Sequence, residues 1–170
     1  MKPKIKSLRL LILDACVLID FLKVEPSLLV DISQCIGSLH VVSFVLDEVP
    51  LIASDEEAAR LGLKVINPEV DDIYGALDKS GRTSFQDELC CLTAKRQGFV
   101  CVTNDKALRR RCKEEGVSVL RGLRLLIELY RAGGIGKRKV LQIAENIKEN
   151  NPYHITREIM KDFEEEIEDI

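Results

Sequence analysis

The order of short apolar runs along the chain is the feature that most constrains its fold. Five such runs are separated by segments with helical patterns, at spacings that leave room for a helix between them. Strands and helices that alternate in this way favour βαβ units and a parallel sheet. The predicted strands are LRLLIL (8–13), LHVV (39–42), LKVIN (63–67), FVCVT (99–103) and VSVL (117–120).

Two of the predicted strands run directly into acidic residues. LRLLIL is followed by Asp14, and FVCVT is followed by Asn104 and Asp105. In an open parallel sheet, ligands lie in the crevice beyond the carboxyl ends of the strands. Acids gathered there repel one another unless they are protonated or share a cation. The pattern indicates a divalent metal site, although each acid taken alone is also explained as a helix cap or a helix-terminal charge.

Two more acids lie near predicted helix starts. Ser43 is expected to cap a helix, FVLDEVPLIA, that carries Glu48, with the neighbouring Asp47 as a competing candidate. Ser84 is expected to cap the helix SFQDELCCLTAKRQG, in which Asp87 occupies the capping-box position. The candidate acidic set is therefore Asp14, Glu48, Asp87 and Asp105.

Composition places the chain among globular proteins. It has 170 residues, of which 46% are apolar and 31% are charged, which suits one domain with a sizeable core. Its apolar runs are too short to cross a bilayer, and no signal-peptide cleavage site follows the basic N-terminus. We therefore expect a cytoplasmic protein with no membrane segment.

The charge distribution is more informative than the formal net charge of −3, which does not by itself indicate a nucleic-acid partner. Basic residues cluster at 106–113 and 136–140, whereas acids crowd 162–169. Such clusters are usually solvated helix faces, but a near-neutral average can also conceal a basic patch. The patch beside Asp105 is a candidate for salt-sensitive contacts with RNA phosphates through Lys106, Arg109, Arg110 and Arg111. Consecutive arginines point about 100° apart on a helix, so not all of them can face one substrate.

Cysteine and histidine usage argues against two other kinds of site. The chain has six cysteines and two histidines, and no two cysteines are spaced as C-x-x-C. A structural zinc site or a disulfide framework is therefore not expected. No Ser–His or Cys–His pair is apparent that would support covalent catalysis.

Four segments together resemble the PIN-domain nucleases, and especially the VapC-like toxins of prokaryotic toxin–antitoxin pairs. The family has a strand ending in Asp, a Ser-started helix with a Glu, an Asp on a helix with small apolar residues, and a strand ending in Thr-x-Asp. The matching segments follow the family's order over residues 8–120: LILDACVLIDFL, SFVLDEV, SFQDELCCLTAKRQG and VCVTND.

The resemblance implies a fold and a domain organisation. The expected architecture is an α/β fold with three layers, α/β/α, around a central parallel sheet of four to five strands. This PIN-like domain would span residues 1–136. A C-terminal helical extension, residues 137–170, would pack on the same domain or on a partner chain. The resemblance and the apolar helices after residue 121 also predict a homodimer.

The resemblance further implies an activity, which is a metal-dependent endoribonuclease that acts as the toxin of a toxin–antitoxin pair. The four candidate acids would be catalytic and would hold Mg²⁺ or Mn²⁺, with Thr103 and Asn104 as supporting groups. Hard oxygen ligands suit these cations on chemical grounds as well. The expected partners are an RNA substrate and an antitoxin protein.

Two alternatives remain open at this point. A phosphatase of the haloacid-dehalogenase type also begins with a strand ending in Asp, but it needs a second Asp two residues later, where this chain has Cys16. A non-catalytic RNA-binding domain could retain the same fold. Cys16 is also a departure from the PIN pattern, in which Asn or Ser is commoner, and it predicts a weaker hydrogen bond to the first acid.

Overall fold

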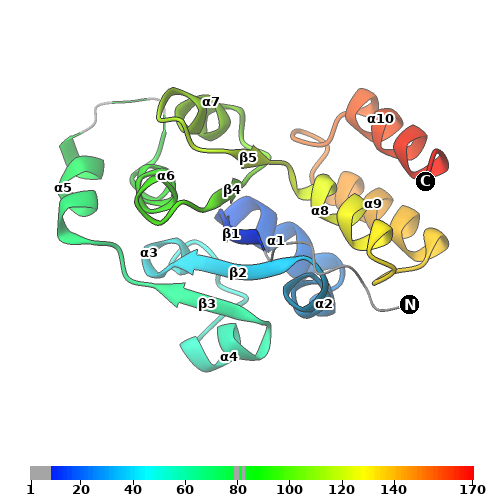
Figure 1. The fold of residues 1–170 in the computed structure, drawn as a ribbon, viewed down its shortest axis with the longest axis horizontal. Coiled ribbons are helices and arrows are strands. Elements are labelled where there is room, and N and C mark those ends of the chain that lie inside the picture. Colours follow the sequence, from blue (N-terminus) through cyan, green and yellow to red (C-terminus); the bar gives the residue numbers. More distant parts are fainter. Residues whose placement is uncertain (1–8, 79–80, 82) are drawn as a thin grey trace.

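A five-stranded parallel sheet forms the centre of the computed structural model, which describes residues 9–78, 81 and 83–170. The strand order is β3-β2-β1-β4-β5, and every adjacent pair is parallel (Figure 1). All five predicted strands are present to within two residues. They are β1 (Arg9–Leu13), β2 (Gly37–Val42), β3 (Leu63–Ile66), β4 (Val100–Val102) and β5 (Val119–Leu120).

Helices flank the sheet, as the α/β prediction requires. Helix α6 packs against β1, β2 and β4, whereas α2 packs against β2 and β3 (Figure 1). The helices up to the fifth strand are α1 (Ala15–Val24), α2 (Ser27–Cys35), α3 (Ser43–Leu46), α4 (Asp55–Arg60), α5 (Val70–Asp78), α6 (Phe85–Gln97) and α7 (Lys106–Glu114).

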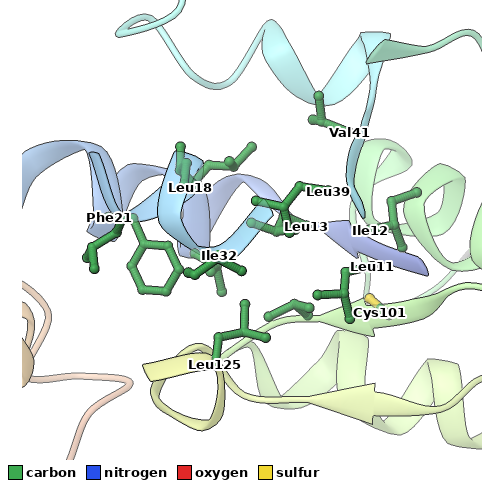
Figure 2. Close-up of a cluster of buried hydrophobic side chains, with 14 of the residues drawn as sticks. Leu11, Ile12, Leu13, Leu18, Phe21, Ile32, Leu39, Val41, Cys101 and Leu125 are labelled. Atoms are coloured by element: carbon green, nitrogen blue, oxygen red, sulfur yellow. The ribbon is translucent and has the colours of Figure 1, made fainter. Parts of the chain in front are cut away.

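The central position of β1 in the sheet explains its apolar sequence. Leu11, Ile12 and Leu13 are all fully buried, because a central strand of a parallel sheet is covered on both faces. They contact apolar side chains from the neighbouring strands and helices, including Leu39 and Leu125 (Figure 2). A continuous apolar run followed by an acid is therefore the expected signature of this strand and its exit.

The strand order creates a crevice between β1 and β4. After β1 the chain connects to β2 on one side, and after β4 it connects to β5 on the other side. The two connections diverge, which is the topological switch point at which open α/β sheets bind ligands. Leu13 pairs with Val102, so Asp14 and Thr103 follow β1 and β4 at the same level. The backbone N–H of Asp14 donates to the carbonyl of Val102 at 3.2 Å.

Three helices follow the sheet: α8 (Gly122–Arg131), α9 (Lys137–Asn150) and α10 (Arg157–Glu168). Helix α9 packs against α1 and α8, and α10 packs against α8 and α9. Val140, Ala144 and Ile147 of α9 are buried in this packing. The division into domains at residues 136 and 137 stays a prediction. In the part of the chain that the structure describes, every helix is too short or too polar to cross a membrane.

The region after β2 differs from the helix predicted for FVLDEVPLIA. Helix α3 ends at Leu46, Val42 is its N-cap, and Ser43 is its first helical residue, so Ser43 is not the cap. The chain then continues in turns, in which the N–H of Glu48 donates to the carbonyl of Val45 at 3.1 Å. The following helix α4, with Ser54 as its side-chain cap, was not predicted from the sequence.

Candidate active site

Asp14 lies at the end of β1, and its carboxylate is held by two elements. One oxygen accepts a hydrogen bond from the N–H of Val17 at 3.0 Å, which makes Asp14 the N-cap of α1. The other oxygen accepts from the hydroxyl of Thr103, and the thiol of Cys16 also donates to this carboxylate. The side chain is 3% exposed. Asp14 therefore caps α1 and also lies at the carboxyl end of β1, where the sequence predicts the site.

Thr103 connects the first acid to the last. Its fully buried hydroxyl donates to Asp14 and accepts from the backbone N–H of Asp105 at 3.0 Å. Asp105 in turn caps α7, because its carboxylate accepts from the N–H of Leu108 at 2.8 Å. Because the hydroxyl of Thr103 makes one hydrogen bond to Asp14 and another to the backbone of Asp105, it fixes the positions of the two acids relative to each other at the ends of β1 and β4.

Asp87 reaches the crevice from α6. Ser84 is the N-cap of this helix, and its hydroxyl accepts from the N–H of Asp87 at 3.1 Å, as the capping box predicts. Asp87 is half-buried. Burial raises the pKa of its carboxyl group, hydrogen bonds from Ser84 oppose this change, and repulsion from Asp105 adds to it.

Glu48 lies in the turn that follows α3 and is exposed, as is its neighbour Asp47. Partial burial raises the pKa of Glu48, and repulsion from Asp87 and Asp47 raises it further. Glu48 is therefore close enough to Asp87 for their charges to interact. Both Glu48 and Asp47 remain candidates for the second acid.

The four acids are linked by mutual repulsion centred on Asp87. The pKa of Asp14 is raised to about 7. Burial is the main cause and repulsion from Asp87 adds to it, whereas hydrogen bonds from Thr103 and Val17 oppose the rise. Among the described residues, no lysine, arginine or histidine forms an ion pair with any of the four. The crevice therefore concentrates negative charge, while the charge of Arg109 lies close enough to that of Asp105 to interact with it.

The acids do not form a closed coordination shell. In the described part of the chain, no three or more His, Cys, Asp or Glu side chains are grouped so that they could jointly hold a metal ion. Mg²⁺ usually keeps several waters and takes only one or two carboxylates directly. The donor chemistry, hard carboxylate oxygens that form no ion pair within the described part of the chain, fits such a partly hydrated cation better than a fully caged one.

Asn104 joins the strand end to two helices. Its side-chain oxygen, Oδ1, accepts a hydrogen bond from the backbone N–H of Gly122 at 3.0 Å. Gly122 begins α8, whose N-cap residue makes no side-chain capping bond. The amide nitrogen of Asn104 donates to Asp20 of α1 at 3.4 Å. A Cβ at position 122 would lie 3.3 Å from this amide, so the close approach favours glycine. Asn104, which was predicted as a supporting residue, is thus buried and connects the end of β4 to α1 and α8 by hydrogen bonds.

Asp20 is a buried acid of this region that the sequence analysis missed. It is 5% exposed, and it accepts hydrogen bonds from Asn104 and from the side-chain amide of Asn151, the latter at 3.1 and 3.2 Å. Burial raises its pKa, which these hydrogen bonds and the charge of His154 oppose. A lone acid inside the apolar helix segment ACVLIDFLK was the available signal. Its partner Asn151, 131 positions away, was not apparent from sequence.

The basic segment divides into two groups. Lys106 and Arg110 are exposed, and half-buried Arg109 donates to the carbonyl of Asn104 at 2.6 Å. The side chain of Arg111 is only 11% exposed and pairs with Glu88 at 2.9 Å and with Glu115 at 2.5 Å. Its charge is already compensated within the chain, which differs from the expectation that it faces RNA.

Comparison with known proteins supports the fold. A similar solved structure is that of a PilT N-terminus domain protein from the hyperthermophilic archaeon Sulfolobus solfataricus P2, with a TM-score of 0.54 and 14% sequence identity. The similarity covers 70% of this chain and 92% of that chain. No family model and no curated protein matches the sequence. The fold is therefore PIN-like, whereas the VapC-like assignment stays a prediction.

Proposed function

We propose that this protein is a divalent-metal-dependent endoribonuclease. The observation that carries the proposal is the set of four acids near the switch point of a PIN-like sheet, which are linked by repulsion from Asp87 and form no ion pair within the described part of the chain. Such an arrangement is costly unless a cation is shared, and perturbed acids in a crevice are functional-site candidates. The cation would be Mg²⁺ or Mn²⁺, and Asp14, Glu48, Asp87 and Asp105 would hold it directly or through waters.

The residues of the chain have distinct tasks in this proposal. The bound cation would supply a water of lowered pKa and would offset charge on the phosphoryl oxygens. Thr103 orients the carboxylate of Asp14, because its hydroxyl is fixed from the other side by Asp105. Lys106 and Arg110 are exposed next to Asp105 and would bind RNA phosphates. Arg109 would contribute to the same surface from its position against Asn104.

We also propose the biological setting that the sequence resemblance implies. The protein would be the toxin of a toxin–antitoxin pair, would act in the cytoplasm, and would form a homodimer. These points rest on the four sequence signatures and on the apolar helices after residue 121. Light scattering at micromolar concentration tests the dimer, and a monomeric mass would contradict it.

The proposed activity is tested by incubation of the purified protein with RNA in Mg²⁺ or Mn²⁺. We expect cleavage that stops in chelator and that falls by about 100-fold or more in Asp14→Asn and in Asp105→Asn, because each removes part of the cation site. Asp162→Asn, an exposed acid on α10, is the matched control and should cleave as the wild type does. Cleavage that survives both site substitutions, or persists in chelator, would overturn the proposal.

A separate measurement distinguishes catalysis from binding alone. Titration calorimetry with Mn²⁺ should show uptake by the wild type and weaker uptake by Asp14→Asn. RNA binding without any metal uptake would instead favour a non-catalytic RNA-binding domain. A covalent acyl-phosphate trapped on Asp14 would instead favour the phosphatase chemistry, although Cys16 replaces the second aspartate which that chemistry uses.

A further inference from the structure

A cavity of about 1060 Å³ lies next to the acidic crevice. One wall comes from the end of β4 and from α7, and includes Asp105. The opposite wall comes from the segment between α9 and α10, which extends toward α7 and β5 (orange in Figure 1). The residues of that second wall are Tyr153, His154 and Thr156 of this segment, together with Ile159 of α10. The C-terminal extension therefore contributes part of the lining of a cavity that also includes Asp105, one of the proposed catalytic acids.

The α7 wall carries positive charge. Lys106 and Arg110 line the cavity and are exposed, so their charges are accessible to a ligand. Arg109 lies between them and is held in place by its hydrogen bond to Asn104. Burial lowers the pKa of Arg109 and repulsion from the nearby charge of Arg121 lowers it further, whereas the charge of Asp105 opposes both effects. An anionic ligand would relieve this repulsion.

The opposite wall presents an aromatic ring to solvent. Tyr153 is 85% exposed, and its ring meets that of His154 edge-to-face, with centroids 4.9 Å apart. A single exposed tyrosine is ordinary on a protein surface. This one differs because it lines the same cavity as Lys106 and Arg110 and because its segment is held by hydrogen bonds. Buried Asp20 binds the side chain of Asn151, which in turn accepts from the N–H of His154 at 3.3 Å.

We propose that this cavity binds unpaired nucleotides of a single-stranded RNA, with a base stacked on Tyr153 and phosphates bound by Lys106 and Arg110. The inference rests on the proposed ribonuclease function and assigns to the C-terminal extension a direct contact with the RNA substrate. Aromatic side chains bind bases only where these are unstacked, which is the case in single strands and loops. The cavity volume lies at the upper end of the range of small-molecule sites, roughly 300–1,000 Å³, so it has room for more than one nucleotide.

The test is RNA binding in chelator, so that cleavage cannot interfere. Fluorescence anisotropy would use the full-length protein with a labelled single-stranded RNA of mixed sequence and with the corresponding duplex. We expect Tyr153→Ala to weaken single-strand binding by about five- to a hundredfold, the effect of losing one base–aromatic stack. Tyr153→Phe should bind within about twofold of the wild type. Tyr74→Ala is the matched control, because Tyr74 is 68% exposed on α5 and does not line the cavity.

The proposed phosphate contacts are tested by the salt dependence of RNA binding. Lys106→Ala and Arg110→Ala should each reduce the salt dependence of single-strand binding, by about 0.7 in the logarithmic slope for each phosphate that is no longer bound. Lys64→Ala should leave the slope unchanged, because Lys64 is exposed on β3 at the opposite edge of the sheet.

The outcomes separate this inference from the ribonuclease proposal. Binding that depends on Tyr153, without cleavage when Mn²⁺ is added, would support the cavity assignment and contradict the ribonuclease proposal. Cleavage together with equal binding by wild type and Tyr153→Ala would overturn the cavity assignment alone. A larger effect of Tyr153→Ala on the duplex than on the single strand, or no RNA binding by the wild type, would also overturn it.

Discussion

Buried acids are paired with arginines in one region of the protein and, among the described residues, lack such pairs in another. In the framework around the sheet, Asp72, Glu88 and Glu128 are buried and each is paired with at least one arginine. In the crevice beyond β1 and β4, buried Asp14 and half-buried Asp87 form no ion pair within the described part of the chain, and burial raises the pKa of both. The contrast is sharpest at the adjacent residues Asp87 and Glu88 of α6. This contrast supports the proposal that a bound divalent cation supplies the counter-charge in the crevice.

The framework pairs have the geometry of stabilising contacts. Arg96 donates to both oxygens of Asp72, each at 2.8 Å, and thereby connects α6 with α5. Glu88 accepts from Arg111 of α7 and from the hydroxyl of Thr83 at 2.6 Å. Removal of one partner from such a buried pair leaves the other charge uncompensated. The framework acids are therefore expected to matter for stability, and the crevice acids for metal binding.

The largest expected effect follows from Glu88→Ala. This variant should lower the free energy of unfolding by about 3 kcal/mol, because the largely buried side chain of Arg111 loses one of its two close carboxylate partners and the hydroxyl of Thr83 loses its acceptor. Chemical denaturation in chelator measures the change. Asp87→Asn, one position earlier on the same helix, should change stability by less than about 1 kcal/mol, since Asn can still accept a capping hydrogen bond. Equal destabilisation by both variants would remove the distinction between the two regions.

The second effect is on the pH dependence of stability. The pKa of Asp14 rises from its ordinary value of 3.8 to about 7 in the folded protein, so folding favours the neutral form. The stabilising contribution of the neutral group is complete below about pH 4 and is lost as the pH rises to about 7. We expect the metal-free protein to lose a few kcal/mol over this window, with Asp20, Asp87 and Glu48 acting in the same direction.

Denaturation curves in chelator between about pH 4 and pH 8 measure this loss, and Asp14→Asn should show a shallower decline. Saturating Mn²⁺ should oppose the decline in the wild type, because only the charged carboxylates bind the cation. Metal-free stability that rises between about pH 4 and pH 7 would contradict the assigned direction of the pKa changes.

A third, smaller effect is stabilisation by metal. Mn²⁺ that binds only the folded protein should raise the free energy of unfolding by about 2.7 kcal/mol at a hundredfold excess over its dissociation constant. Asp87→Asn should reduce this gain, whereas Asp162→Asn should keep it, because Asp162 lies exposed on α10. Thermal denaturation at about pH 8 with and without Mn²⁺ provides the comparison. An identical gain in both variants would mean that the cation binds outside the crevice.

The sequence was sufficient to predict the fold class and the helix caps at Asp14, Ser84 and Asp105, because these depend on local patterns, whereas the cap predicted at Ser43 was wrong. The apolar run before Asp14 is dictated by a strand buried on both faces, and Ser84 with Asp87 forms a capping box that can be recognised within four residues. Helix α4 was missed because its six residues, DEEAAR, carry almost no apolar periodicity. The helix predicted through Glu48 was too long because turns take over before Pro50.

Long-range pairing explains the remaining differences. Arg111 has the same local context as Arg110, and only the position of Glu88, 23 residues away on another helix, turns it inward. Asp20 acquires its role from Asn151, 131 residues away, because α9 packs on α1. Tyr153 was not identified, since nothing in its neighbourhood in sequence indicates that its segment faces α7. Each of these contacts depends on how helices are placed around the sheet, which periodicity does not encode.

The smallest predicted effect concerns Cys16, which donates a hydrogen bond from its thiol to Asp14. A hydroxyl is a stronger donor than a thiol and would favour the charged carboxylate more. Cys16→Ser should therefore lower the pKa of Asp14 and shift the pH-dependent loss of stability to lower pH, with a change below about 1 kcal/mol at pH 7. The measurement is the midpoint of that loss in chelator. Cys35→Ser is the control, because Cys35 is an exposed cysteine at the end of α2. A shift to higher pH in Cys16→Ser, or the same shift in Cys35→Ser, would show that the thiol does not set the charge state of Asp14.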